Sequence, residues 1–214
     1  MSELVLYVGD HDLSSWSLRP FLALDASGLS YRLEVIELDR PGTKARIEAV
    51  SPNGKVPVLH RTGARPLVIP ESLAICELVA ELAPGAKLWP EDGDARAMAR
   101  AVSTEMHAGF ASLRREHPMH LTARIERAPS DEVRRDLSRI EAIFADCRAR
   151  FGSGGPFLFG RFSIADCMFA PVATRLRTYG LPAGPASRDF MEAIFAHPSF
   201  TKWETAARLS PRTR

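Results

Sequence analysis

The pattern of hydrophobic and polar positions divides the chain into two parts. In the first part, short apolar runs alternate with segments whose apolar residues recur at helical spacing. Strands are predicted at 4–8, 31–38, 56–60 and 66–69, and helices at 16–27, 43–50 and 71–82. Gly28 is placed to end the first helix, and Thr62-Gly63 is placed to join the last two strands as a hairpin. The predicted order is therefore βαβαββα, with one parallel strand pair from the strand–helix–strand unit and one antiparallel pair from the hairpin.

The strand signals end after residue 83. Proline, glycine and acidic residues at 84–91 indicate a linker, and the remaining pattern is helical. Helices are predicted at 92–116, 130–151, 163–179, 187–196 and 199–209, with a glycine-rich loop at 152–156. We therefore expect an α/β domain over residues 1–83, a linker over 84–91 and an all-helical domain over 92–214.

Composition narrows the class of protein. Hydrophobic residues make up 45% of the chain and charged residues 25%, as in soluble globular proteins. The net charge of +2 and the lack of a basic run give no indication of a nucleic-acid partner. We see no signal peptide and no apolar run long enough for a membrane span, so a cytoplasmic protein without a membrane partner is expected. The three cysteines lie far apart without a CxxC pair, which favours reduced thiols.

The Val56-Pro57 dipeptide stands at the start of a predicted strand, where proline removes a backbone donor. One interpretation is a trans proline at a strand edge. The other is a cis bond, which would turn the backbone groups of Val56 outward to pair with a peptide-like ligand. Only about 5–6% of X-Pro bonds are cis, so the residues alone favour the trans form.

Glu71 and Ser72 fall at the start of the helix predicted over 71–82. They can simply cap that helix, as acidic and hydroxyl residues often do. Alternatively, Ser72 and the free N–H groups of the helix terminus hold a ligand carboxylate, and Glu71 receives an ammonium. Both interpretations stay open at this point.

Two other motifs favour structure over chemistry. Ser163 and Asp166 have the spacing of a capping box, and we expect Asp166 to be buried and important for folding rather than catalysis. His117 and His120 have a spacing that can suit a metal, but Pro118 interrupts the helix and no third ligand is evident. We therefore expect no metal.

Taken in order, the motifs "SSWSLRP", "NGKVPVL", "ESLAICELV" and "FSIADCMFAP" resemble the cytosolic glutathione transferase family, over nearly the whole chain. The serine-rich motif is most similar to the serine-type classes and to the zeta class, the maleylacetoacetate isomerases. The resemblance implies a thioredoxin-like N-terminal domain, glutathione as co-substrate, a homodimer, and an electrophile site between the two domains. It favours a cis bond at Pro57 and assigns the glutathione-binding roles to a short set of residues. These are Lys55, the backbone of Val56, Pro57, Glu71 and Ser72.

The resemblance also implies which residue stabilises the glutathione thiolate. In the serine-type classes the catalytic serine precedes the helix arginine by five residues, and counting back from Arg19 gives Ser14. A hydroxyl at a helix N-terminus can donate to sulfur and lower the thiol pKa. Ser15 is the alternative, Ser17 is expected to pack or cap within the helix, and Tyr7 is a weaker candidate because it lies inside an apolar run.

The second substrate is expected against Trp16, Met106 and Phe110. Trp16 stands where the zeta class has a cysteine and would narrow this electrophile site. Arg175 and Arg177 can meet an acidic substrate, although a solvated surface is slightly favoured for both because most arginines are exposed.

We therefore expect a transferase that conjugates glutathione to small electrophiles, a detoxification activity. One alternative is a glutathione-dependent cis–trans isomerase similar to maleylacetoacetate isomerase. Another is a non-catalytic binding protein with the same fold, since fold alone does not fix function.

Overall fold

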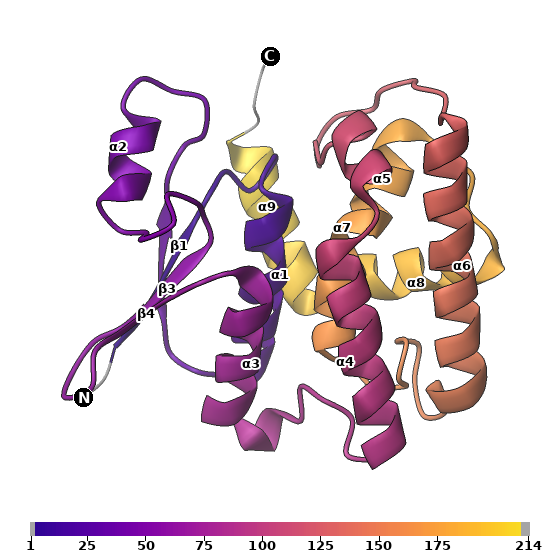
Figure 1. Ribbon diagram of the computed structural model, residues 1–214, viewed down its shortest axis with the longest axis horizontal. Coiled ribbons are helices and arrows are strands. Elements are labelled where there is room, and N and C mark those ends of the chain that lie inside the picture. Colours follow the sequence, from indigo (N-terminus) through magenta and orange to yellow (C-terminus); the bar gives the residue numbers. More distant parts are fainter. Residues whose placement is uncertain (1–2, 211–214) are drawn as a thin grey trace.

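The computed structural model describes residues 3–210, and its N-terminal half is built on a four-stranded sheet (Figure 1). The strands are β1 (Leu4–Val8), β2 (Arg32–Val35), β3 (Val58–Arg61) and β4 (Leu67–Pro70). Their order in the sheet is β2-β1-β3-β4. β1 pairs with β2 in parallel, and the β1–β3 and β3–β4 pairs are antiparallel. Both the parallel pair and the late hairpin predicted from the sequence are confirmed.

Three helices complete this half: α1 (Ser15–Ser27), α2 (Thr43–Glu48) and α3 (Ser72–Leu82). α1 and α3 lie side by side between the sheet and the helical half (Figure 1). α1 ends at Gly28, whose φ of 74° lies in the left-handed region that favours glycine. The order βαβαββα is the one that the pattern of apolar runs predicted, and it agrees with the thioredoxin-like domain that the resemblance implied.

The second half is helical. A short 3-10 helix, η1 (Pro84–Ala86), leads into α4 (Gly93–Ala108) and α5 (Ala111–Glu116), followed by α6 (Asp131–Phe151). The chain then forms α7 (Ile164–Tyr179), α8 (Pro185–Ala196) and α9 (Pro198–Leu209).

The single helix predicted over 92–116 is wrong, because the chain breaks at Gly109 and Phe110. Phe110 has a φ of 57°, in the left-handed region, so the α4 helix cannot continue through it. Gly109 is close-packed, since a side chain there would bring Cβ within 2.9 Å of the Glu105 carbonyl oxygen.

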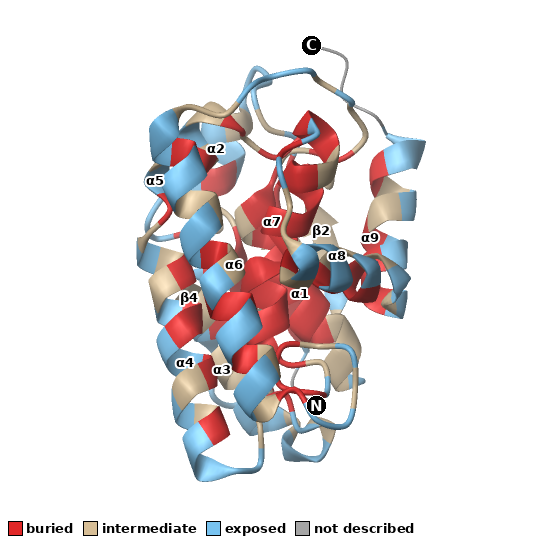
Figure 2. Cartoon of the chain, turned by 90° about the vertical axis from the view of Figure 1, so that its right-hand side faces the viewer, coloured by how far each residue is buried: buried red, intermediate tan, exposed pale blue. Residues whose placement is uncertain are grey.

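The two halves share one hydrophobic core. Every residue of α7 except Arg177 is buried, and α7 packs against α1 in the centre of the molecule (Figure 2). The segment predicted as a linker also contributes, because Leu88 and Trp89 are buried and the Leu88 carbonyl accepts a hydrogen bond from the Ile164 N–H at 2.9 Å. The connection between the halves is therefore packed along part of its length.

The start of α7 carries the predicted capping box. One oxygen of Asp166 accepts hydrogen bonds from the backbone N–H and the hydroxyl of Ser163, both at 2.8 Å. The other oxygen accepts from the Leu158 N–H at 2.9 Å. The Asp166 side chain is fully buried, and this burial raises its pKa to about 6 despite the three donors. The capping box and the burial predicted for Asp166 are confirmed, and its importance for folding stays a prediction.

Among residues 3–210, no helix is both long enough and apolar enough to cross a membrane. Cys76, Cys147 and Cys167 are free and buried. Burial raises the pKa of all three thiols, and that of Cys147 reaches about 12.

Candidate functional site

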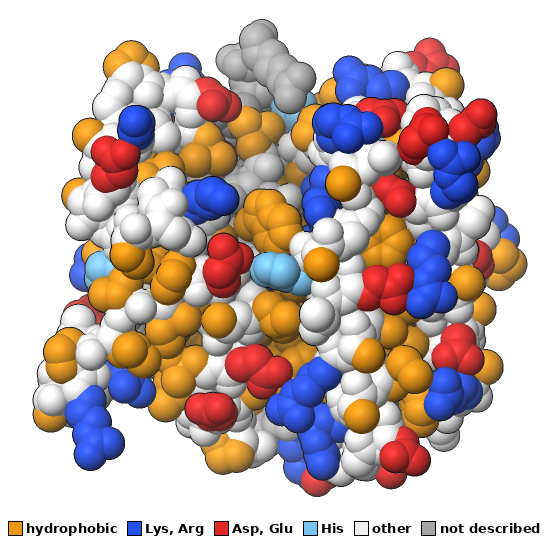
Figure 3. Space-filling model, in the orientation of Figure 1, with side chains coloured by type: hydrophobic (Ala, Val, Ile, Leu, Met, Phe, Trp, Pro, Cys, Tyr) orange, Lys and Arg blue, Asp and Glu red, His pale blue; other side chains and the backbone are white. Residues whose placement is uncertain are grey.

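A cavity of about 390 Å³ lies where the α/β half meets the helical half. Figure 3 shows hydrophobic side chains along the seam between the halves, with charged side chains on both flanks. The cavity is lined by residues from the start of α1, the loop before β3, the start of α3 and the end of α4. They are Trp16, Asn53, Lys55, Val56, Pro57, Glu71, Ser72, His107 and Ala108. All five residues assigned to glutathione by the resemblance are in this set.

The turn from β4 into α3 places two of these residues. Glu71 has φ 76° and ψ 124°, a backbone conformation that is rare for a residue with a side chain and that is enriched at functional sites. Ser72 follows as the first residue of α3, and its buried hydroxyl has no hydrogen-bond partner among the described residues. A buried, unsatisfied hydroxyl at a helix N-terminus, beside a carboxylate, can receive a carboxylate and an ammonium together.

The loop before β3 forms the opposite side of the cavity. The Val56–Pro57 peptide bond is cis, as the resemblance predicted. The Asn53 side chain organises the preceding turn, since its oxygen accepts hydrogen bonds from the Ser51 hydroxyl at 2.9 Å and the Lys55 N–H at 3.1 Å. Lys55 is exposed, so its ammonium lies at the open edge of the cavity.

The three serines of the α1 entry have different partners. Ser14 is the N-cap residue, and its hydroxyl donates to the Ser17 oxygen at 2.8 Å. The Ser17 oxygen also accepts the Gly9 N–H at 3.0 Å. The Ser15 oxygen accepts a hydrogen bond from Arg175 Nη2 at 3.2 Å. None of these serines lines the cavity, which reaches this segment at Trp16.

The segment around Ser14 is tightly packed. A side chain added at Gly9 would bring Cβ within 3.0 Å of the Ser14 hydroxyl oxygen and within 2.9 Å of Leu38. The Ser14 N–H donates to the Asp10 carbonyl at 2.9 Å, which closes the turn between β1 and α1. The position of the Ser14 hydroxyl is therefore fixed by its neighbours.

Trp16 forms a wall of the cavity and is itself held by charged and aromatic groups. The Arg19 guanidinium lies 4.0 Å from the centroid of the indole, and that of Arg114 lies 5.4 Å away. The His107 ring meets the indole edge-on, with 5.2 Å between centroids. These cation–π and edge-to-face contacts hold the indole in place.

Buried arginines lie next to this wall. Arg19 is fully buried, and its guanidinium has no hydrogen-bond partner among the described residues. Burial, reinforced by Arg175 and Arg114, lowers the pKa of Arg19. Burial also lowers the pKa of Arg175 to about 10, with a smaller contribution from Arg114. The site therefore has a positive interior, since arginine stays protonated in proteins.

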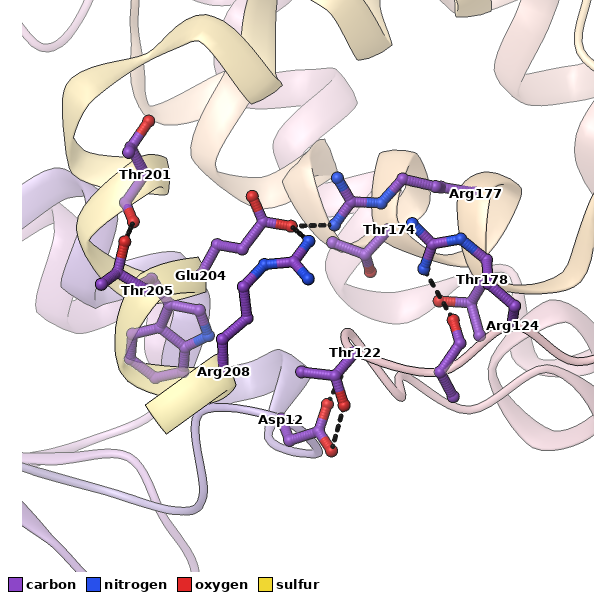
Figure 4. Close-up of polar contacts among 12 residues, drawn as sticks. Asp12, Thr122, Arg124, Thr174, Arg177, Thr178, Thr201, Glu204, Thr205 and Arg208 are labelled. Carbon is purple, nitrogen blue, oxygen red and sulfur yellow. Dashed lines mark hydrogen bonds and ion pairs between the residues drawn. The ribbon is translucent and has the colours of Figure 1, made fainter. Parts of the chain in front are cut away.

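The residues predicted for the electrophile site are not all brought together. Trp16 lines the cavity, whereas Met106 and Phe110 are buried in the core and do not line it. The solvated surface favoured for Arg175 is wrong, because that side chain is buried and its Nε donates to the His117 carbonyl at 2.9 Å. Arg177 is half-buried and pairs with Glu204, which also receives Arg208 (Figure 4).

Sequence reasoning missed His107, which lines the cavity 3.7 Å from the Glu71 carboxylate. The sequence correctly placed Tyr7 in the first strand, where its ring packs on the His60 ring with 4.8 Å between centroids.

His117 and His120, which were considered as a metal pair, have different partners. His117 Nε2 contacts the Arg127 carbonyl, and His120 pairs with Asp12. Within the part of the chain that the structure describes, no three acidic, histidine or cysteine side chains are grouped to hold a metal ion.

Two models of one protein family match this chain. Residues 13–82 match the family model "Glutathione S-transferase, N-terminal domain", and residues 130–206 match "Glutathione S-transferase, C-terminal domain". A probable maleylacetoacetate isomerase from Caenorhabditis elegans is 26% identical over 186 residues, covering 85% of this chain and 82% of the relative.

Solved structures of similar fold include proteins with glutathione bound. A maleylacetoacetate isomerase from Anaeromyxobacter dehalogenans, with glutathione bound in the active site, is 25% identical with a TM-score of 0.72, and 99% of each chain is covered. A glutathione transferase homolog from Sulfitobacter, with bound glutathione, is 22% identical with a TM-score of 0.70, covering 96% of this chain and 98% of that one. This last likeness concerns the fold.

Proposed function

We propose, from the premise that this chain belongs to the glutathione S-transferase family, that it conjugates the thiolate of glutathione to small electrophiles. Glutathione is the co-substrate of the family, and the residues of the cavity fit it. The observation that carries the proposal is the buried hydroxyl of Ser72, which has no hydrogen-bond partner within residues 3–210 and lines the cavity together with Glu71. These two groups match the carboxylate and the ammonium at the γ-glutamyl end of the tripeptide.

The other cavity residues suit the rest of glutathione. The backbone of Val56 can pair with the cysteinyl part, and the Lys55 ammonium can meet the glycine carboxylate at the open edge. This orientation directs the thiol toward the start of α1, where Trp16 lines the cavity. The electrophile then approaches the sulfur from the side of the indole.

Ser14 is our candidate for stabilising the thiolate, with Ser15 as the alternative. Hydroxyl protons rotate to suit their partners. If the Ser17 proton turns toward the Ser14 oxygen, 2.8 Å away, the Ser14 proton becomes free to be donated to sulfur. The N-terminus of α1 and the buried guanidinium groups of Arg19 and Arg175 add positive potential, which also favours a thiolate.

The test compares Ser14→Ala with Ser15→Ala in conjugation of a chlorinated nitrobenzene. A hydrogen bond to a charged group contributes about 1.5–3 kcal/mol, so removing the correct hydroxyl should lower kcat about 10- to 100-fold. It should also raise the pKa of bound glutathione by about 1–2 units toward the value near 8.5 of a free thiol. An unchanged pH–rate profile in Ser14→Ala would exclude that role for Ser14.

A second candidate function is glutathione-dependent isomerisation, because relatives from C. elegans and A. dehalogenans carry the name maleylacetoacetate isomerase. In this reaction the thiolate would add to a carbon–carbon double bond, the new single bond would rotate, and the thiolate would leave again, so that glutathione is regenerated. Parallel assays with maleylacetoacetate and the chlorinated nitrobenzene separate the two activities. Turnover of the diketo acid alone would replace the leading proposal.

Three further expectations remain predictions. The chain should form a homodimer, which sedimentation equilibrium can measure, and fractionation should find it in the cytoplasm. It should also be retained on glutathione resin. Failure to bind the resin would favour the third hypothesis, a non-catalytic binding protein in which the cavity residues serve only the fold.

A further inference from the structure

The segment that carries Ser14 is held by the helical half at three points. From α9, Trp203 Nε1 donates a hydrogen bond to the His11 carbonyl at 2.7 Å. From the loop between α5 and α6, the Leu121 N–H donates to the Asp12 carbonyl at 3.0 Å. From α7, Arg175 Nη2 donates to the Ser15 oxygen at 3.2 Å. Three separate elements of the second half thus contact residues 11–15, the turn between β1 and α1.

Asp12 makes the most extensive of these contacts. Its carboxylate is fully buried and accepts hydrogen bonds from the Thr122 N–H at 2.8 Å and the Thr122 hydroxyl at 3.2 Å (Figure 4). The Nε2 atom of His120 lies 3.1 Å from the same carboxylate, and the His120 side chain is also buried. We call these contacts of Asp12 with His120, Leu121 and Thr122 the Asp12 clasp.

The clasp is poorly explained by stability alone. A buried charge loses several kcal/mol of hydration, and well-packed apolar residues often give equal or greater stability at such positions. What a buried polar group adds is geometry, because its hydrogen bonds are satisfied in one arrangement only. Asp12 therefore specifies where its backbone lies relative to the helical half.

The position of the Asp12 backbone determines the position of Ser14, because few residues separate them and the intervening turn is hydrogen-bonded. Ser14 lies two residues after Asp12, and its N–H is bonded to the Asp10 carbonyl within the same turn. The Ser14 hydroxyl lies 2.8 Å from the Ser17 oxygen, and it packs so close to Gly9 that a side chain added there would bring its Cβ within 3.0 Å of the hydroxyl oxygen. A shift of Asp12 cannot be absorbed before Ser14 without breaking these contacts.

We propose that Asp12 is a positioning residue for the thiolate: the clasp anchors the turn to the helical half and thereby fixes the Ser14 hydroxyl relative to the cavity. The inference rests on the proposed role of Ser14. Asp12 lies outside the set of cavity-lining residues, so we expect no direct contact between its carboxylate and glutathione. The helical half would then hold the Ser14 hydroxyl in position toward the thiol, in addition to forming one side of the electrophile site.

The test uses Asp12→Asn in the full chain, which keeps the shape of the side chain and removes its charge. The matched control is Glu141→Gln. Glu141 is another carboxylate that joins two elements of the helical half, accepting the N–H groups of Ala186 at 2.9 Å and Ser187 at 3.0 Å, far from the α1 entry in the sequence. For each variant we would measure the pKa of bound glutathione from thiolate ultraviolet absorbance, the glutathione Kd by calorimetry, and kcat and KM for conjugation.

Asp12→Asn should raise the pKa of bound glutathione by at least about half a unit and lower kcat about 3-fold or more, since each pKa unit corresponds to about tenfold in thiolate stabilisation. KM and Kd for glutathione should stay within about 2-fold, which a loss of transition-state alignment predicts. Glu141→Gln should leave the pKa unchanged. If Asp12→Asn does not fold, Thr122→Val removes only the hydroxyl contact and should shift the pKa in the same direction by less.

Two results distinguish the failures. If Ser14→Ala raises the pKa of bound glutathione and Asp12→Asn lowers only the stability, the clasp is structural and the inference is overturned. If Ser14→Ala itself leaves the pKa unchanged, the role of Ser14 is wrong and the inference falls with it.

Discussion

Replacing Asp166 by alanine should destabilise the protein far more than removing an ordinary helix cap. The substitution leaves three buried donors without an acceptor, namely the Leu158 N–H and the N–H and hydroxyl of Ser163. An unsatisfied buried donor costs about 1–3 kcal/mol. The Ser163 hydroxyl can rotate to another partner, so the two N–H groups dominate, and we expect a loss of about 3–5 kcal/mol.

The matched control is Asp92→Ala. Asp92 is the N-cap of α4, is exposed, and its side chain accepts a hydrogen bond from the Ala95 N–H at 2.8 Å. Removing such a cap costs about 1 kcal/mol. Urea unfolding at pH 7, followed by tryptophan fluorescence and far-ultraviolet circular dichroism, gives both values. If the two losses differ by less than about 1 kcal/mol, burial of the capping box adds nothing and the reasoning is refuted.

Two further predictions concern charge. Glu71→Gln should weaken glutathione binding about tenfold or more by calorimetry, because the amide cannot neutralise the ligand ammonium; an unchanged Kd would remove Glu71 from the site. The second follows from the Asp166 pKa of about 6 against the ordinary 3.8, since the folded state then binds a proton that the unfolded chain releases. Most of this contribution to stability is present at pH 4, and it is lost as the pH rises through 6. The unfolding free energy of the natural protein should therefore fall, relative to Asp166→Asn, by about 2 kcal/mol between pH 4 and 6.5. Parallel curves for the two proteins would contradict the raised pKa.

The elements that the sequence predicts well are those in which local pattern and tertiary packing agree. The apolar run at 4–8 is β1 with the predicted bounds, and Gly28 ends α1 as its position suggested. The break between α4 and α5 was not predicted, although Gly109 is a possible helix end, because a single glycine is tolerated inside a helix and the apolar spacing continues on both sides of it. Only the backbone of Phe110 reveals the turn.

Some residues of the candidate site were predicted from the sequence and others were not. The residues alone left the ligand-binding roles of Val56, Glu71 and Ser72 as one of two interpretations, and the family resemblance selected that interpretation and added Lys55; all four line the cavity. His107 was missed because it lies next to Met106 in a helix without any motif, and the sequence does not indicate which α4 residues reach the cavity. Arg175 was expected to be solvated because most arginines are, and its burial follows from the enclosure of α7 on all sides.

The core shared by the two halves has a consequence for how such chains can be recombined. One side of α1 packs against α3 and another against α7, so each half completes the apolar surroundings of the other. Exchanging the helical half for that of a relative would place foreign side chains against α1, most of whose residues are buried. Chimeras that join halves of two relatives should therefore express well only when the facing surfaces of α1 and α7 come from the same parent. A working exchange must keep this contact intact, and the position of the linker does not ensure that.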